Sequence, residues 1–412
     1  MQTWWGRYIC LRGILLLQRA VVARESRIFR DRKVFSDDFV PEDLPARQAH
    51  VEKVEESLGE ALYGEPPVDL FLYGPPGTGK TACIKLVISR LEAAARASGA
   101  PVRVDYVNCG WVRTGYRVMS RLCKSFDPTI PSVGLPFDEL YEMYISLLSE
   151  HKCIQIVVLD ELDNLVMRSG DDLLYSLVRI NGDLNGLASV TLVGVSNSLT
   201  FMEKLGPKIT SALNPITVRF APYRASELRE ILYQRVELGF QPGAVDPEVV
   251  PYLAAFVAQE SGDARKAIQL LRVAGEYAEQ SRSGVVKLEH VRRARDQFER
   301  DEYFDLISAL PIQRKAVLAS VAIAFKYRDR HGRPAHTGLI YEIYKKICEK
   351  NKLDPLSMRS IRRVLKYFAS LGLLEIDLVH LEGGGSAFAV LEMSPPPDEV
   401  LKILQNGDLV LS

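Results

Sequence analysis

The sequence predicts an α/β domain with a parallel sheet and helices on both faces, followed by a helical region and a C-terminal domain of helices and a hairpin. Three observations lead to this fold class. A glycine-rich loop at residues 74–81 lies between an apolar run and a helical pattern. Runs of β-branched residues alternate with helical stretches up to residue 222, as in parallel sheets. A basic helical pattern and a hairpin pattern occur near the end of the chain.

Length and composition indicate a multidomain globular chain. Its 412 residues exceed what one core usually organises, and 47% hydrophobic with 25% charged residues is ordinary for a soluble protein. The net charge is zero, but residues 311–370 carry 14 Lys and Arg against 4 Asp and Glu, whereas residues 371–412 carry one Lys against seven acids. The basic block predicts a surface for a polyanion.

The six cysteines are scattered without paired spacing, as expected of a reduced cytoplasmic protein with neither a zinc site nor disulfides. In residues 1–30, arginines interrupt the apolar residues at short intervals, so we expect no membrane span and no cleaved leader. We interpret this segment as a basic N-terminal arm, frayed or ordered by a partner. An amphipathic surface anchor is the alternative.

Residues 74–81, Gly-Pro-Pro-Gly-Thr-Gly-Lys-Thr, form a complete phosphate-binding loop pattern between a predicted strand and a predicted helix. Glycines let backbone N–H groups approach a phosphate chain, Lys80 can neutralise the β and γ oxygens, and the Thr81 hydroxyl can bind Mg²⁺. The expected contacts are Pro76, Gly77, Thr78, Gly79, Lys80 and Thr81. A nucleoside triphosphate site is therefore predicted. A chance glycine turn before a helix is the alternative.

Two carboxylates end the buried-strand pattern at residues 156–159. Asp160 can hold Mg²⁺ through water, and Glu161 can polarise an attacking water. The alternative is that the pair only caps the following helix. Asn197 follows another strand pattern, at the carboxyl end where ligands of such sheets bind, unless it only forms a turn.

After residue 222, four amphipathic helix patterns predict a small bundle. The stretch 261–268 begins one of these helices with an N-cap signal, and Arg265 follows as a cation in the first turn. A cation in the first turn opposes the helix dipole, so an anionic partner explains Arg265 better than local stability does. The alternative is an ordinary surface arginine.

The C-terminal region predicts two helices, a turn whose Ser357 caps a third helix at 358–371, and a hairpin. This order is typical of a winged helix, whose third helix enters the major groove while the wing tip contacts a minor groove or the backbone. A winged helix used only for protein contacts is the alternative. The expected DNA contacts are Arg359, Arg362, Arg363 and Lys366 on the third helix, and Gly383, Gly384 and Gly385 at the tip.

Together these motifs resemble the Walker A, Walker B, sensor 1 and sensor 2 elements of AAA+ ATPases. More narrowly, the chain resembles the archaeal origin-recognition and cell-division-cycle replication initiators. The narrower resemblance depends on short stretches at 40–47, 106–109, 116–118, 134–136 and 220–223, and it covers nearly all of residues 30–395. It implies an arm at 1–30, an AAA+ core at 31–222, a helical lid at 223–302 and a winged helix at 303–412.

The resemblance also implies site residues that spacing alone does not give. The adenine would lie near Val40, Pro41 and Arg47, with Tyr223 and Arg235 as further nucleotide contacts and Arg265 as sensor 2. A helical insertion at about 110–136 would contact DNA. Its cations, spaced as one helix face, are Arg113, Arg117, Arg121 and Lys124.

One departure from the family concerns residues 206–208, Gly-Pro-Lys, where the family usually has Asp-Pro-Arg with a finger arginine that reaches a neighbouring subunit's nucleotide. Lys208 lacks the planar fork of arginine, which argues against trans-activated hydrolysis through this position.

We therefore interpret the chain as an ATP-dependent initiator that binds ATP or ADP with Mg²⁺, hydrolyses ATP slowly, binds double-stranded origin DNA and helps recruit or load the replicative helicase. The expected catalytic residues are Lys80, Asp160, Glu161, Asn197 and Arg265, and the expected metal ligands are Thr81 and Asp160. The expected location is the cytoplasm, at the nucleoid, with a paralogous initiator as a further partner. Alternatives are a clamp-loader or junction-helicase motor and a nucleotide-gated transcription regulator.

Overall fold

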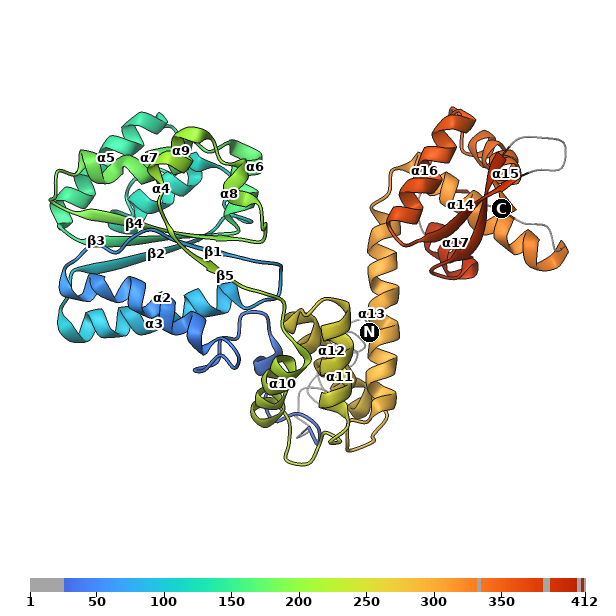
Figure 1. The fold of residues 1–412 in the computed structure, drawn as a ribbon, viewed down its shortest axis with the longest axis horizontal. Coiled ribbons are helices and arrows are strands. Elements are labelled where there is room, and N and C mark those ends of the chain that lie inside the picture. The colour runs from blue at the N-terminus through green and yellow to red at the C-terminus, as the bar shows by residue number, and fades with distance from the viewer. Residues whose placement is uncertain (1–25, 332–334, 381–385, 406–408, 411–412) are drawn as a thin grey trace, which may run out of the picture. The chain divides into compact units, whose positions relative to one another are not determined.

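The computed structural model describes residues 26–331, 335–380, 386–405 and 409–410. The chain divides into two compact units, Met1–Arg292 and Arg293–Ser412. Each unit has its own core, and the two are described separately below (Figure 1).

A five-stranded parallel sheet forms the centre of the first unit, with the order β2-β3-β4-β1-β5. The strands are β1 (Leu70–Tyr73), β2 (Val102–Asn108), β3 (Ile154–Asp160), β4 (Ser189–Ser196) and β5 (Ile216–Arg219). Every residue of β3 is buried, because side chains on both faces of this interior strand pack under helices. The predicted parallel α/β sheet is confirmed.

Helices cover both faces of this sheet (Figure 1). One face carries α2 (Gln48–Gly59) and α3 (Lys80–Ser98), and the helix η2 (Glu60–Tyr63) follows α2. The other carries α4 (Gly115–Phe126), α5 (Phe137–His151), α6 (Leu162–Ser169), α7 (Asp172–Asp183), α8 (Phe201–Lys204) and α9 (Pro207–Ala212). Along β3, Ile156 and Val158 pack on the α2–α3 side, while Val157 and Leu159 pack on the other. The two cores thus follow the alternation of side chains along a strand.

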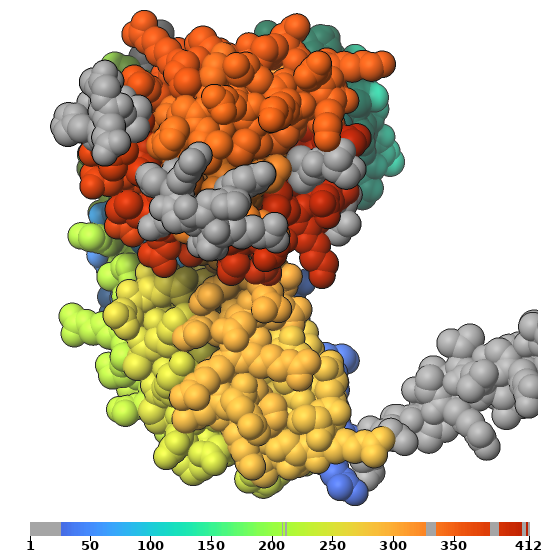
Figure 2. Space-filling view, turned by 90° about the vertical axis from the view of Figure 1, so that its right-hand side faces the viewer, coloured from blue at the N-terminus to red at the C-terminus, as the bar shows by residue number. Residues whose placement is uncertain are grey.

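The lid follows the sheet and consists of α10 (Ala225–Gly239), α11 (Val249–Glu260), α12 (Ala264–Gln280) and the start of α13 (Leu288–Ser308). Residues 26–35, which include the helix η1 (Arg32–Phe35), pack against it; they are drawn in blue beside the yellow lid helices in Figure 2. Phe29 stacks on Phe240 with ring centroids 5.0 Å apart, and Phe35 meets the same ring edge-on at 5.1 Å.

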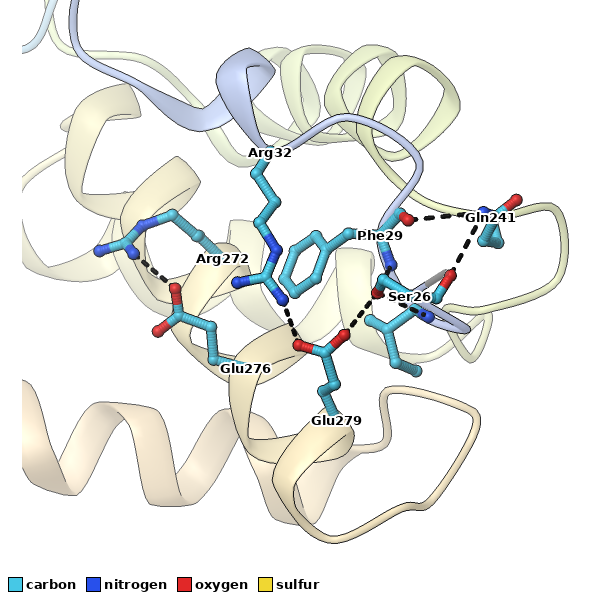
Figure 3. A network of polar contacts seen from close by, with 8 residues as sticks. Ser26, Phe29, Arg32, Gln241, Arg272, Glu276 and Glu279 are labelled. Atoms are coloured by element: carbon cyan, nitrogen blue, oxygen red, sulfur yellow. Dashed lines mark hydrogen bonds and ion pairs between the residues drawn. The ribbon is translucent and has the colours of Figure 1, made fainter. Parts of the chain in front are cut away.

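Polar contacts fix the same segment to α12 (Figure 3). The Ser26 hydroxyl donates to Oε1 of Glu279 at 2.5 Å, and Arg32 pairs with the other carboxylate oxygen. Residues 26–30 therefore belong to the packed lid and not to the N-terminal arm that the sequence predicts, because Ile28 and Phe29 are buried there. Residues 1–25 lie outside the described part of the chain.

The second unit contains α14 (Ile312–His331), α15 (Thr337–Lys350), α16 (Met358–Ser370) and α17 (Pro397–Gln405). An antiparallel sheet of β6 (Ala335–His336), β8 (Ser386–Met393) and β7 (Leu374–His380), in that order, completes it. The Ser357 hydroxyl accepts from Ser360 N–H at 3.3 Å, which gives the predicted N-cap of α16. The predicted winged helix is confirmed. Its glycine tip, Gly383, Gly384 and Gly385, lies outside the described residues.

Candidate functional site

The phosphate-binding loop, residues 74–81, joins β1 to α3, and its last two residues form the start of that helix. Gly77 and Gly79 have φ angles of +69° and +92°, in the left-handed region that favours glycine. The Thr78 hydroxyl donates to the carbonyl of Pro75 at 2.8 Å and holds the turn. The loop and the N-terminal N–H groups of α3 together form a site that favours an anion.

Lys80 lies folded across the loop that precedes it. Its ammonium donates to the carbonyls of Gly74 at 2.8 Å and Pro75 at 2.7 Å, and the residue is buried. Burial lowers the pKa of Lys80 to about 8, although the nearby Asp160 carboxylate acts in the opposite direction. The ammonium is thus confined to the site, and no carboxylate of the described residues lies at contact distance from it.

Side chains from β2 and α3 both contact Oδ2 of Asp160, the last residue of β3. This oxygen accepts from the Thr81 hydroxyl at 2.9 Å and from the Tyr106 hydroxyl at 2.5 Å, and the residue is only 2% exposed. Burial, together with Asp160, raises the pKa of Tyr106, so its hydroxyl remains a donor. Sequence reasoning did not predict that Tyr106 contacts Asp160. The register of β2 on β3 pairs Asn108 with Asp160, and Tyr106 lies two residues before Asn108 on β2.

A hydroxyl and a carboxylate at contact distance are hard oxygen ligands of the type that Mg²⁺ prefers, together with phosphate oxygens and water. Thr81 and Asp160 therefore fit a magnesium ion that is held jointly with a nucleotide. No cluster of three or more His, Cys, Asp or Glu side chains suited to a metal occurs among the described residues.

Glu161 and Asn197 follow neighbouring strands and line the same pocket. Glu161 precedes α6 in the left-handed conformation, with φ 55°, and its Oε2 accepts from the Asn164 amide at 2.8 Å. The Asn197 backbone N–H donates to Asp163 at 3.2 Å, and its side chain is exposed. Both side chains lie at the carboxyl edge of the sheet, as the sequence predicts.

The pocket above this loop lies between the core and the lid of the first unit. Its apolar lining includes Phe35, Phe39, Pro41, Leu44, Ile231 and Ile268, while Tyr223, Arg235 and Arg265 line it from the lid side. Val40 is not part of the lining, because its side chain packs on the core near α2 and α3. An apolar cleft with a phosphate loop at one end suits a purine nucleotide.

Arg47 differs from the expectation that it lies near the base. It is buried behind the loop, where Nε donates to the Thr78 carbonyl at 2.9 Å and Nη2 donates to the Ala221 carbonyl at 2.6 Å. Its guanidinium carbon is 3.8 Å from the centroid of the Tyr223 ring. Arg47 therefore ties the phosphate loop to the start of the lid instead of lining the pocket.

Arg235 is a buried cation that lines the pocket from α10. Its Nε and Nη1 atoms have no hydrogen-bond partner among the described residues, and its guanidinium carbon lies 4.7 Å from the Phe39 ring centroid. Burial lowers the pKa of Arg235 to about 10. Unpaired buried donors are costly, so this side chain is prepared for an acceptor that a ligand supplies.

Arg265 is the second residue of α12 and already has an acidic neighbour within the chain. Its Nε lies 3.7 Å from Oδ1 of Asp37, and both side chains are about half exposed. Asp263 caps the helix by accepting from the N–H groups of Arg265 at 2.7 Å and Lys266 at 3.1 Å. The Ala264 N–H donates to the Gly77 carbonyl at 3.1 Å, which joins the lid to the phosphate loop.

The cations of the insertion lie at α4. Arg117 and Arg121 are exposed, whereas Lys124 is half-buried and bonds to the Ser132 hydroxyl. The expectation that all four cations share a helix face is wrong for Arg113, because Thr114 is the N-cap and Arg113 precedes the helix. The buried face of α4 consists of Val118, Met119, Ser120, Leu122 and Cys123.

On α16 the predicted basic face lies opposite the core. Ile361, Leu365 and Phe368 are fully buried. The cations on the exposed side are Arg359, Arg362, Arg363 and Lys366. Lys208 of the first unit lies in α9. Among the described residues, no helix is long and apolar enough to cross a membrane.

Three family models match the chain. They are an AAA domain over residues 70–202, the Cdc6 AAA+ ATPase-type lid domain over 229–296, and the CDC6 C-terminal winged helix domain over 305–403. The residues matched by the lid family lie within the stretch from α10 to α13, and the residues matched by the winged-helix family lie within the second unit.

Similar whole proteins are known as well. The ORC1-type DNA replication protein 1 of Aeropyrum pernix is 43% identical over 358 residues, which cover 87% of this chain and 90% of that protein. The ORC1-type DNA replication protein of Pyrococcus abyssi is 40% identical and covers 88% and 86%. The structure of the Aeropyrum pernix ORC1 protein in complex with DNA has a TM-score of 0.74 at 41% identity and covers 93% of this chain and 98% of that chain.

Proposed function

The chain belongs to the ORC1-type family of archaeal DNA replication proteins, and we propose that it is an ATP-dependent initiator that binds double-stranded origin DNA and helps recruit or load the replicative helicase. The observation that carries the nucleotide part is the pocket in which the phosphate loop and Arg235 face one cleft, with the Nε and Nη1 atoms of Arg235 unpartnered among the described residues.

In this proposal the phosphates lie on the N-terminal N–H groups of α3, and Lys80 turns from the loop carbonyls to the β and γ oxygens. Thr81 and Asp160 would hold magnesium, which would neutralise charge on the phosphates. Pro41 and the apolar lining surround the base, and Arg235 and Arg265 contact the nucleotide from the lid. Tyr223 fixes the position of the phosphate loop through Arg47.

Hydrolysis requires a group that orients water opposite the γ-phosphate. Glu161 and Asn197 are suited to this role, since both line the pocket at the carboxyl edge of the sheet. We infer that turnover is slow and regulatory, because Lys208 stands where the family has a finger arginine. Nucleotide state would then regulate DNA binding more than it would drive movement.

The DNA part is supported by two separate basic surfaces, one on α16 and one around α4. The Aeropyrum pernix ORC1 structure is a DNA complex, and its similarity spans both units of this chain. We infer that α16 enters the major groove and that the α4 cations hold phosphates on the same duplex. A paralogous initiator at the same origin and a location at the nucleoid fit this role.

Footprinting on genomic DNA tests the proposal. Protection of a few repeated elements near one origin, and binding of the replicative helicase to the protein on that DNA, are the expected results. Protection of scattered promoters would instead indicate a transcription regulator, and protection without sequence preference would indicate a motor.

A further inference from the structure

Trp111 is a large apolar side chain to which the proposed function assigns no task. Its exposed fraction is 84%, although tryptophan side chains are mostly buried in folded proteins. It lies in the loop that joins β2 to α4. An indole in water forfeits the stabilisation that burial would bring, so this position requires an explanation.

The backbone on both sides of Trp111 is fixed. The Asn108 amide oxygen accepts from Gly110 N–H at 2.9 Å and from Trp111 N–H at 3.3 Å. Cys109 is fully buried, and Val112 packs against the core beneath α4 to α7. With its neighbours pointing inward, Trp111 is presented to solvent on an ordered loop. The entropic cost of fixing such a side chain against a partner is therefore small.

The charges near Trp111 indicate the kind of partner. In the sequence, no Asp or Glu occurs between Asp105 and Asp127, while four cations do. In space, the Glu161 carboxylate lies beside Gly110, the residue before Trp111. Arg113, Arg117 and Arg121 are exposed. Within residues 109–126, Trp111 is the one large apolar side chain that is mostly exposed. A stable protein interface has a broad apolar core, whereas this surface offers a single indole among cations. Such a surface suits a polyanion that also has apolar faces, as the bases and sugars of a nucleic acid do.

We propose that Trp111 is an apolar DNA contact whose indole enters a groove of the duplex while Arg113, Arg117 and Arg121 hold the adjacent phosphates. The inference rests on the proposed function in taking duplex DNA as the partner. Phosphate contacts position a protein on DNA, whereas contacts with bases and sugars respond to sequence and shape. Apolar side chains inserted at base steps also kink the duplex. Trp111 thus adds affinity that does not depend on salt.

Tryptophan fluorescence tests the contact directly. The chain has three tryptophans, Trp4, Trp5 and Trp111, so the full-length variant Trp4→Phe/Trp5→Phe reports on Trp111 alone. Titration with unlabelled duplex DNA should quench or shift this emission, with the same midpoint as an independent binding assay. Unchanged emission at saturating duplex would overturn the inference.

A salt titration separates the indole from the cations. Trp111→Ala should weaken duplex binding on the order of tenfold, the size of an aromatic contact with a base, without changing the slope of log K against log salt. Arg117→Ala should instead reduce that slope by about 0.9. Trp111→Phe should retain most of the affinity. Tyr63→Ala is the matched control, because Tyr63 is an 88% exposed aromatic residue on η2.

The remaining outcomes are distinct. If Trp111→Ala leaves duplex affinity unchanged, or weakens only self-association measured by sedimentation, the residue is not a DNA contact. If the unaltered full chain fails to bind duplex at all, the proposed function itself fails. Equal thermal unfolding of the variants shows that they are folded.

Discussion

A Cβ atom built at Gly77 would lie 1.8 Å from Oδ1 of Asp263, although the two residues are 186 positions apart in the sequence. The phosphate loop and the first turn of α12 therefore fit together only with glycine at position 77. The Ala264 N–H bond to the Gly77 carbonyl fixes the same contact. The lid thus touches the loop that is proposed to hold the phosphates.

Gly77→Ala should separate the lid from the loop and weaken nucleotide binding at least tenfold, because a contact of 1.8 Å forces one of them to move. Gly64→Ala is the matched control: Gly64 also has a positive φ, but no atom of the described residues lies within 4 Å of its built Cβ. Isothermal titration with ADP measures both. Equal affinities of the two variants would show that the contact with Asp263 does not matter.

Lys80→Ala should abolish nucleotide binding, while Glu161→Gln should retain ATP and lose turnover by about a hundredfold or more. The first change removes the charge beside the phosphates, and the second removes only the carboxylate that activates water. A nucleotide titration and a phosphate-release assay measure the two effects. Normal turnover by Glu161→Gln would contradict the role proposed for that side chain.

Nucleotide affinity should be constant below about pH 8 and should fall above it. The pKa of Lys80 is lowered to about 8 by burial, and phosphate oxygens raise it again in the complex. Binding therefore takes up a proton above pH 8, and affinity decreases as pH rises towards the pKa of the complex. ADP titrations from pH 6.5 to 9.5 measure this. Lys80→Arg, which does not titrate, should bind with no such decrease.

Arg235→Met should weaken nucleotide binding and yet raise the melting temperature of the nucleotide-free protein. Nε and Nη1 of Arg235 have no partner among the described residues, so this cation is costly to bury without a ligand, and methionine removes that cost. Thermal unfolding with and without ADP measures both quantities, and the ADP-induced shift should shrink. A lower melting temperature without nucleotide would show that Arg235 stabilises the lid.

Arg363→Ala and Lys366→Ala should each weaken duplex binding and reduce the salt slope by about 0.9 for each phosphate that the variant no longer neutralises. The exposed Arg229 on α10 provides a control of equal charge. Double replacement of Arg117 and Arg121 should shorten the footprint on one side. Unchanged slopes for both α16 variants would mean that this helix faces protein or solvent.

Local sequence patterns were sufficient to predict the elements whose functional residues are consecutive or closely spaced. The phosphate loop, the acids after β3 and the winged helix could be predicted because glycine freedom, strand burial and helix periodicity act over a few positions. The loop residues of the candidate site were found in the same way. Val40 and Arg47 show the limit, since position in a motif did not reveal which way each side chain points.

The sequence by itself therefore determined that a nucleotide loop, a lid and a basic winged helix exist in this chain. Only the tertiary structure decided that Tyr106 meets Asp160, that Asp37 lies beside Arg265, and that residues 26–35 pack on the lid. Each of these contacts joins residues more than 50 positions apart. Such pairs are selected by the packing of whole elements, which leaves no spacing pattern along the chain.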